Sequence, residues 1–128
     1  VSSGAPRSGL GWYEQTADGW TLHEIDDSIS QLHALRLADI NGDGLPDLVT
    51  GKRFWAHREG DDGLDDPAVL CWFEMKREAG RPSWIRHDID FASGVGLHFE
   101  IVDIDGDGLL DIVTSNKKGV YVFLQERR

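Results

Sequence analysis

The chain contains an internal repeat, and a repeat restricts the fold to architectures built from copies of one unit. A shift of 64 residues aligns residues 20–52 with residues 84–116 without a gap, and 13 of these 33 positions are identical. The best-matched stretches are WTLHEID with WIRHDID, and DINGDGLPDLVT with DIDGDGLLDIVT. We therefore interpret the 128 residues as one domain of repeated units, residues 1–128.

Each unit is predicted to contain four short strands. The first two are residues 32–40 and 47–51 in one unit, and residues 97–104 and 111–115 in the other. The third strands are the aromatic runs GWYEQ, CWFEM and YVFLQ, and the fourth strands begin at Trp20 and Trp84. No window shows a sustained apolar period of 3.6 residues, so the predicted fold class is all-β without helix.

These strands divide the chain into three parts. A preceding strand pair covers residues 10–26, a first repeat covers about residues 32–90, and a second repeat covers about residues 96–125. The first repeat also contains a polar insertion, residues 53–67, which is predicted to be a long surface loop. Loops of this length often carry function, but a solvated acidic loop is the commoner case.

The composition excludes several classes of partner. The chain has 13 Lys and Arg against 23 Asp and Glu, a net charge of −10, which repels nucleic acids and anionic membranes. No apolar run is long enough to be inserted in a bilayer. The single cysteine, Cys71, allows no internal disulfide and is predicted to be a buried, unreactive thiol. No common catalytic motif is present, so we assign no catalytic residue and favour a non-catalytic protein.

Two aspartate-rich loops carry the most specific functional signal. Oxygen-bearing side chains recur at loop positions 1, 3, 5 and 9, and glycine at position 6 permits the tight turn that brings them together. The pattern is the first half of an EF-hand loop, followed here by a strand. Mostly anionic oxygen ligands favour a hard cation, and their number favours Ca²⁺ over Mg²⁺. With leucine carbonyls at position 7, the expected ligands are Asp39, Asn41, Asp43, Leu45 and Asp47, and then Asp103, Asp105, Asp107, Leu109 and Asp111.

The second loop is expected to bind calcium more tightly than the first. It offers four carboxylates, whereas the first loop offers three carboxylates and the amide of Asn41. The alternative is that both loops are plain hairpin turns. Repulsion between carboxylates this close, ~1 kcal/mol or more per pair, argues against that alternative.

Histidine and basic residues outside the loops are weaker candidates. His23 and His87 are equivalent in the repeat, which explains them structurally, whereas His33 and His98 are not equivalent and share no common role. Basic residues follow the second strand of each unit, next to Trp55, His57 or Asn116, and form a candidate site for an anionic or sugar ligand. A solvated turn beside acidic neighbours is the commoner explanation. The candidate ligand-binding residues are His33, Lys52, Arg53, His98 and Lys117.

The aspartate loop, the Ile/Leu-Val strand after it and the later aromatic strand together resemble the FG-GAP (VCBS) repeat. This repeat is the blade unit of calcium-binding β-propellers such as the head of the integrin α-subunit. The resemblance covers about residues 10–125. It implies about two four-stranded antiparallel blades per chain, two Ca²⁺ sites at the loop residues named above, and an extracellular, periplasmic or cell-surface location.

Under this resemblance the chain contains slightly more than two blades, whereas a closed propeller has about four to eight. We therefore expect copies of the chain to associate into a ring, the Trp20 strand of one copy completing the blade that ends at residues 121–125 of another. A longer propeller is the alternative. The expected function is a calcium-stabilised, non-catalytic module that binds protein or carbohydrate. Part of a secreted carbohydrate-active lyase or hydrolase, and a purely structural self-assembling fragment, are the alternatives.

Overall fold

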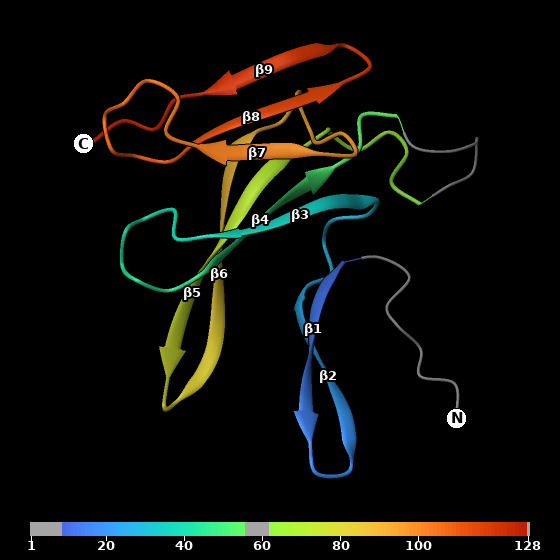
Figure 1. Cartoon of the computed structure of the whole chain (residues 1–128). Coiled ribbons are helices and arrows are strands. Elements are labelled where there is room, and N and C mark those ends of the chain that lie inside the picture. Colours follow the sequence, from blue (N-terminus) through green and yellow to red (C-terminus); the bar gives the residue numbers. More distant parts are fainter. Residues whose placement is uncertain (1–8, 56–61, 128) are drawn as a thin grey trace.

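The fold consists of three small antiparallel sheets that follow one another along the chain (Figure 1). The computed structural model describes residues 9–55 and 62–127, and all regular elements in these ranges are strands, as the sequence predicted. None of these residues forms a helix that is long and apolar enough to cross a membrane. The strands are β1 (Leu10–Thr16), β2 (Gly19–Asp26), β3 (Leu32–Ala38), β4 (Asp47–Lys52), β5 (Leu70–Glu78), β6 (Arg81–Asp90), β7 (Phe99–Val102), β8 (Asp111–Asn116) and β9 (Gly119–Phe123).

The sheets contain two, four and three strands, in the orders β1-β2, β3-β4-β5-β6 and β7-β8-β9. The sequence had been divided over the same residues into a strand pair, a complete unit and a unit without its fourth strand. The predicted ends differ slightly, since β3 stops at Ala38 instead of Ile40. The reason is that the backbone N–H of Ile40 donates to the Asp47 carboxylate, 2.9 Å away, so the chain turns into the loop.

The middle sheet has two apolar faces, because side chains alternate along each strand. Face A carries Leu48 of β4 and Cys71 and Phe73 of β5, and face B carries the intervening Val49 and Leu70. All five side chains are buried. A sheet that is buried on both sides needs a partner on each face, and the flanking sheets supply them.

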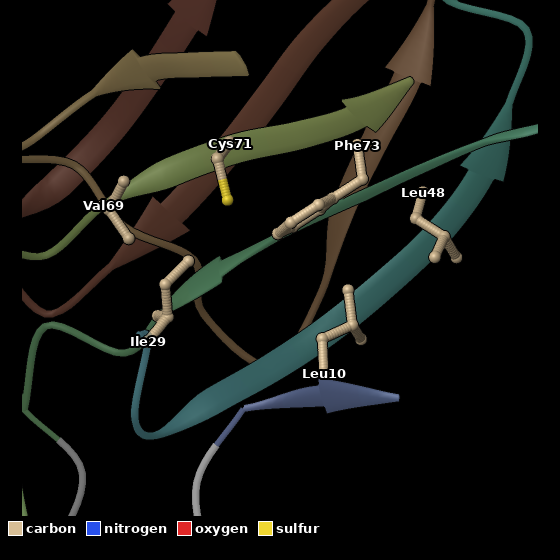
Figure 2. Close-up of a cluster of buried hydrophobic side chains, with 6 residues drawn as sticks. All are labelled: Leu10, Ile29, Leu48, Val69, Cys71 and Phe73. Atoms are coloured by element: carbon tan, nitrogen blue, oxygen red, sulfur yellow. The ribbon is translucent and has the colours of Figure 1, made fainter. Parts of the chain in front are cut away.

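One end of the β1-β2 hairpin packs on face A. Leu10 of β1 packs with Leu48, Cys71 and Phe73, and Ile29 and Val69 complete this cluster (Figure 2). Face B packs against the third sheet, where Val49 and Leu70 contact Phe99 of β7 and Ile112 of β8. The two cores therefore lie on opposite sides of one sheet, and the three sheets are stacked in chain order.

The ends of the strands opposite the aspartate loops are tied together by backbone contacts. Lys52 at the end of β4 donates its N–H to Val69 O at 2.9 Å, and its carbonyl accepts the N–H of Val95 at 3.0 Å. Arg53 forms an isolated parallel bridge with Val95. The predicted long loop at 53–67 begins here, and its residues 56–61, with His57, lie outside the described residues.

Candidate calcium-binding loops

The second aspartate loop gathers three carboxylates at one point between β7 and β8. Oxygens of Asp103, Asp105 and Asp111 all lie within 4.8 Å of one another. Among the residues that the structure describes, this is the one group of three or more carboxylate, imidazole or thiolate ligands that close. Two Ca²⁺–O bonds of about 2.4 Å on opposite sides of an ion span the same distance, so one ion can contact all three side chains.

Backbone amides hold these carboxylates in place. Asp103 accepts hydrogen bonds from Gly106 N at 2.7 Å and Gly108 N at 2.9 Å, so it spans the turn. Asp107 accepts from Leu109 N at 2.8 Å. Gly106 and Gly108 have φ values of 83° and 87°, in the left-handed region that glycine adopts without strain. The glycines therefore fix the curvature that turns the aspartates toward the inside of the loop.

Asp111 is buried at the base of this loop. Its two carboxylate oxygens accept hydrogen bonds from Ile104 N and Gln125 N, both at 2.9 Å. These N–H groups, Ile104 first and then Gln125, lower the pKa of Asp111 below its ordinary value. Because Ile104 precedes β8 and Gln125 follows β9, the carboxylate joins the loop to the end of the third strand. The same arrangement recurs in the first loop, where buried Asp47 accepts from Ile40 N and Met75 N.

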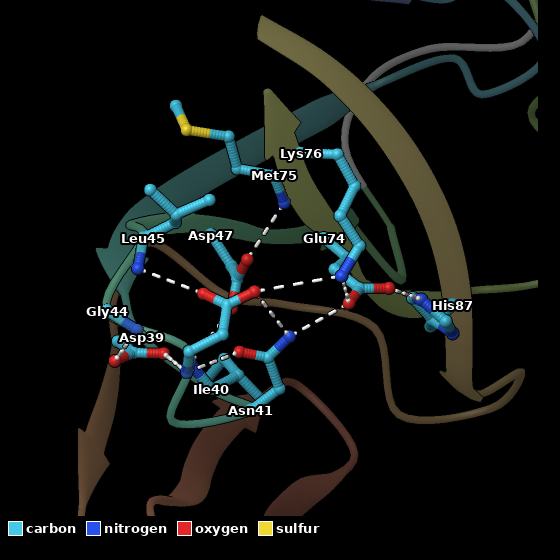
Figure 3. A network of polar contacts seen from close by, with 11 residues as sticks. Asp39, Ile40, Asn41, Gly44, Leu45, Asp47, Glu74, Met75, Lys76 and His87 are labelled. Carbon is cyan, nitrogen blue, oxygen red and sulfur yellow. Dashed lines mark hydrogen bonds and ion pairs between the residues drawn. The ribbon is translucent and has the colours of Figure 1, made fainter. Parts of the chain in front are cut away.

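The first loop is organised differently at its mouth (Figure 3). The Asn41 amide donates from Nδ2 to Asp43 Oδ2 at 3.2 Å and to Glu74 Oε1 at 2.9 Å. The Lys76 ammonium forms an ion pair with Glu74 and lies 3.7 Å from Asp43 Oδ2. Asp39 at position 1 accepts from Asp43 N and Gly44 N. The Asn41 amide and the Lys76 ammonium thus both lie beside Asp43 at the mouth of the first loop, and Lys76 adds a positive charge there.

The second loop has the opposite charge at the position of Lys76. The hydrogen bonds of Met75 N to Asp47 and of Gln125 N to Asp111 make Met75 and Gln125 equivalent, so Lys76 corresponds to Glu126. The repeat therefore pairs a lysine with a glutamate at this position, and the guanidinium of Arg127, the next residue, lies beside Gly108 of the second loop. Sequence reasoning missed Lys76 and Glu74, since they lie on the third strand, distant in sequence from the loop they contact.

A Trp-His-Glu arrangement connects the first loop to the fourth strand. The rings of Trp72 and His87 stack with centroids 4.4 Å apart, and His87 Nε2 lies 3.0 Å from Glu74 Oε2. Lys76 first, and then His87, lowers the pKa of Glu74. The β1-β2 hairpin repeats the arrangement with Trp12, Glu14 and His23, with the same 4.4 Å and 3.0 Å separations. The shared W-x-E pattern of GWYE and CWFE was the available sequence signal.

Three of the five candidate ligand-binding residues meet at the end of the strands opposite the loops. Arg53, His98 and Lys117 line one groove of about 370 Å³, together with Trp55 and Asn116. Arg53 and Lys117 are equivalent in the repeat, and each follows the second strand of its unit. The neighbouring Lys118 ammonium lies 4.0 Å from the centre of the Phe54 ring. This groove thus combines cationic and aromatic groups within an acidic chain.

The other two candidates lie elsewhere. Lys52 is 2% exposed, and its Nζ donates to the backbone carbonyl of Asp66 at 2.6 Å, so it stabilises the loop before β5. His33 is exposed on β3 and does not line the groove. His98 Nδ1 lies 3.2 Å from the guanidinium Nη2 of Arg36 on β3. His33 and His98 therefore occupy separate surroundings.

Comparisons with known proteins give no family for this chain. A scan against protein-family models and searches of curated proteins and of solved structures found no match. The functional argument therefore depends on the geometry of the loops and the groove.

Proposed function

We propose that this chain is a calcium-stabilised module of the β-propeller repeat type that binds a protein or carbohydrate and catalyses no reaction. The observation that carries the proposal is the convergence of Asp103, Asp105 and Asp111 to within 4.8 Å. Carboxylates this close repel one another unless a cation lies between them. All-oxygen ligation by a flexible loop favours Ca²⁺, with Asp107 and the Leu109 carbonyl as further ligands from the same loop.

The two loops are proposed to differ in affinity. The second loop offers four carboxylates, whereas the first loop offers three carboxylates and an amide, so a divalent ion finds more negative charge among the ligands of the second loop. The first loop has Asn41 at position 3 and the Lys76 ammonium 3.7 Å from Asp43, so a nearby positive charge repels a calcium ion bound there. We therefore propose a strong site at Asp103–Asp111 and a weaker one at Asp39–Asp47.

The location of the protein is proposed on the same basis. Calcium-binding loops of extracellular modules have dissociation constants of about 10⁻⁴–10⁻³ M. Such loops are occupied only where the concentration of free calcium is comparably high. An extracellular, periplasmic or cell-surface location fits this range.

Isothermal titration with CaCl₂ tests the proposal. The wild-type chain is expected to show one dominant binding event and a weaker second one. Asp105→Asn, which makes the second loop resemble the first, should weaken the dominant event at least tenfold. The reciprocal pair Asn41→Asp with Lys76→Glu should strengthen the weaker event. An absence of binding heat, together with melting curves that are identical in calcium and in EGTA, would overturn the proposal.

The groove at the opposite end of the strands supports a ligand-binding role. Arg53 and Lys117 supply positive charge, and Trp55, which is 53% exposed, supplies an aromatic surface. A sugar with a carboxylate matches both, because the ring packs on tryptophan and the carboxylate pairs with a cation. We propose an acidic saccharide as the ligand of this groove.

Binding of oligogalacturonate, compared with a neutral oligosaccharide of equal length, tests this part. Arg53→Ala and Lys117→Ala should each weaken oligogalacturonate binding, whereas Lys76→Ala, on a different surface, should leave it unchanged. Equal binding of the neutral oligosaccharide would contradict the role of the cations. Shortened products in the same incubation would favour the lyase or hydrolase alternative over a binding module.

A further inference from the structure

The three stacked sheets use one packing arrangement twice. The pairs Leu48–Phe73 in the middle sheet and Ile112–Phe123 in the third sheet occupy equivalent register positions, so Ile112 and Phe123 mark face A of the third sheet. Both side chains belong to the cluster that packs on face B of the middle sheet. Face A of one sheet therefore packs on face B of the sheet before it.

The hairpin follows the same order. Trp12 pairs with His23 as Trp72 pairs with His87, which makes β1 equivalent to β5 and β2 equivalent to β6. Leu10 and Ile25 of the hairpin then correspond to Leu70 and Ile89, which are face B positions. Leu10 and Ile25 pack on face A of the middle sheet. Each contact between adjacent sheets therefore joins a face A to a face B.

Two apolar faces at the ends of this stack have no partner among residues 9–55 and 62–127. Val122 corresponds to Trp72, so it lies on face B of the third sheet. Val122 is 50% exposed, and this face is therefore exposed and aliphatic. Face A of the hairpin is exposed and aromatic, since Tyr13 corresponds to Phe73 and Trp20, which is 66% exposed, corresponds to Trp84. The exposed apolar side chains of the two faces are Tyr13 and Trp20 on the hairpin, and Val102, Val120, Val122 and Leu124 on or just after the third sheet.

From this pairing rule we infer that a second copy of this chain docks its hairpin, by the Tyr13 and Trp20 face, onto the Val122 face of the third sheet. The contact repeats the A-to-B packing already present twice within the chain. It joins two different surfaces, so it is heterologous, and its repetition gives a closed ring or a growing filament. The sequence instead led us to expect that β2, the Trp20 strand, adds to the third sheet of another copy as its fourth strand. The edge of β2 that this pairing needs is equivalent to the edge of β6 that pairs with β5, and in this chain it already pairs with β1.

Sedimentation velocity over a micromolar to submillimolar range is the first test. The wild-type chain is expected to form species heavier than its 14.3 kDa monomer in a concentration-dependent way. Val122→Lys and Trp20→Lys each place a charge on one exposed face and should raise the concentration needed for association more than tenfold. Ile85→Lys is the matched control, because Ile85 is 48% exposed and lies on neither end face. Circular dichroism verifies that all three variants fold.

Mixing the two face variants is the decisive test, since each retains the face that the other has lost. A heterologous contact predicts a one-to-one complex of Val122→Lys with Trp20→Lys that does not grow further. A monomer at every wild-type concentration, or a mixture without complex, would overturn the inference. Association that neither lysine weakens would also overturn it.

Discussion

Replacing Asp111 by Asn separates the structural role of this carboxylate from any role in calcium binding. Asp111 is buried, and each of its two oxygens accepts one backbone N–H at 2.9 Å. Asn has the same shape but one acceptor, so its NH₂ group must face either Ile104 N–H or Gln125 N–H. The variant therefore loses one hydrogen bond, weakens the other and buries unpaired donors.

The expected cost follows from these contacts. A hydrogen bond to a charged group contributes about 1.5–3 kcal/mol, and a buried donor without a partner costs about 1–3 kcal/mol. Allowing for the hydrogen bond that Asn retains, we expect Asp111→Asn to lower the free energy of unfolding by about 3 kcal/mol. For a domain of this size, that loss corresponds to a melting temperature lower by about 10 °C.

Thermal melting in EGTA measures this effect without metal. Asp47→Asn should have a similar cost, because Asp47 accepts from Ile40 N and Met75 N with the same geometry. Asp107→Asn is the control, since Asp107 is exposed and accepts only the N–H of Leu109 through its Oδ1. If Asp111→Asn and Asp107→Asn melted at the same temperature in EGTA, the proposed link between the loop and the third strand would be refuted.

Three further predictions concern other parts of the fold. Burial raises the pKa of the Cys71 thiol to about 12, so iodoacetamide should modify the native chain negligibly at pH 8 and rapidly in urea, as followed by mass spectrometry. The backbone N–H groups of Ala92 and Ser93 lower the pKa of Asp90. The contribution of the ionised Asp90 carboxylate to stability is therefore fully present at pH values above the ordinary aspartate pKa. It is lost as the pH falls through the lowered pKa of Asp90. Asp90→Asn should cost about 1 kcal/mol at pH 7, measured by urea unfolding, and less as the solution is acidified through that range. A Cβ on Gly51 would overlap the carbonyl oxygen of Val69, so Gly51→Ala should cost about 2 kcal/mol, whereas Gly119→Ala, with open space around its Cα, should not lower the melting temperature.

The strand content was predictable because its signals are local. Alternating apolar residues and aromatic runs can be recognised over a few neighbouring positions, and most strands occur twice in the repeat. The loop aspartates were predictable for the same reason, because their ligand spacing fits within nine residues. The interpretation of these sheets as propeller blades, and of the loops as calcium sites, stays a prediction.

The asymmetry between the loops was not predictable from the loop sequences. Lys76 reaches Asp43 only because β5 pairs beside β4 in one register, Leu48 opposite Phe73. That register is a long-range property, set by the alternation of two buried faces. The same applies to Lys52, whose repeat equivalent is Asn116 and whose burial depends on the loop around Asp66.

Every contact between neighbouring sheets joins a face A to a face B. Duplication of one complete four-stranded unit would therefore lengthen the stack of sheets and leave the existing contacts between sheets unchanged. The number of units in such an array can therefore change while the kind of contact between neighbouring sheets stays the same.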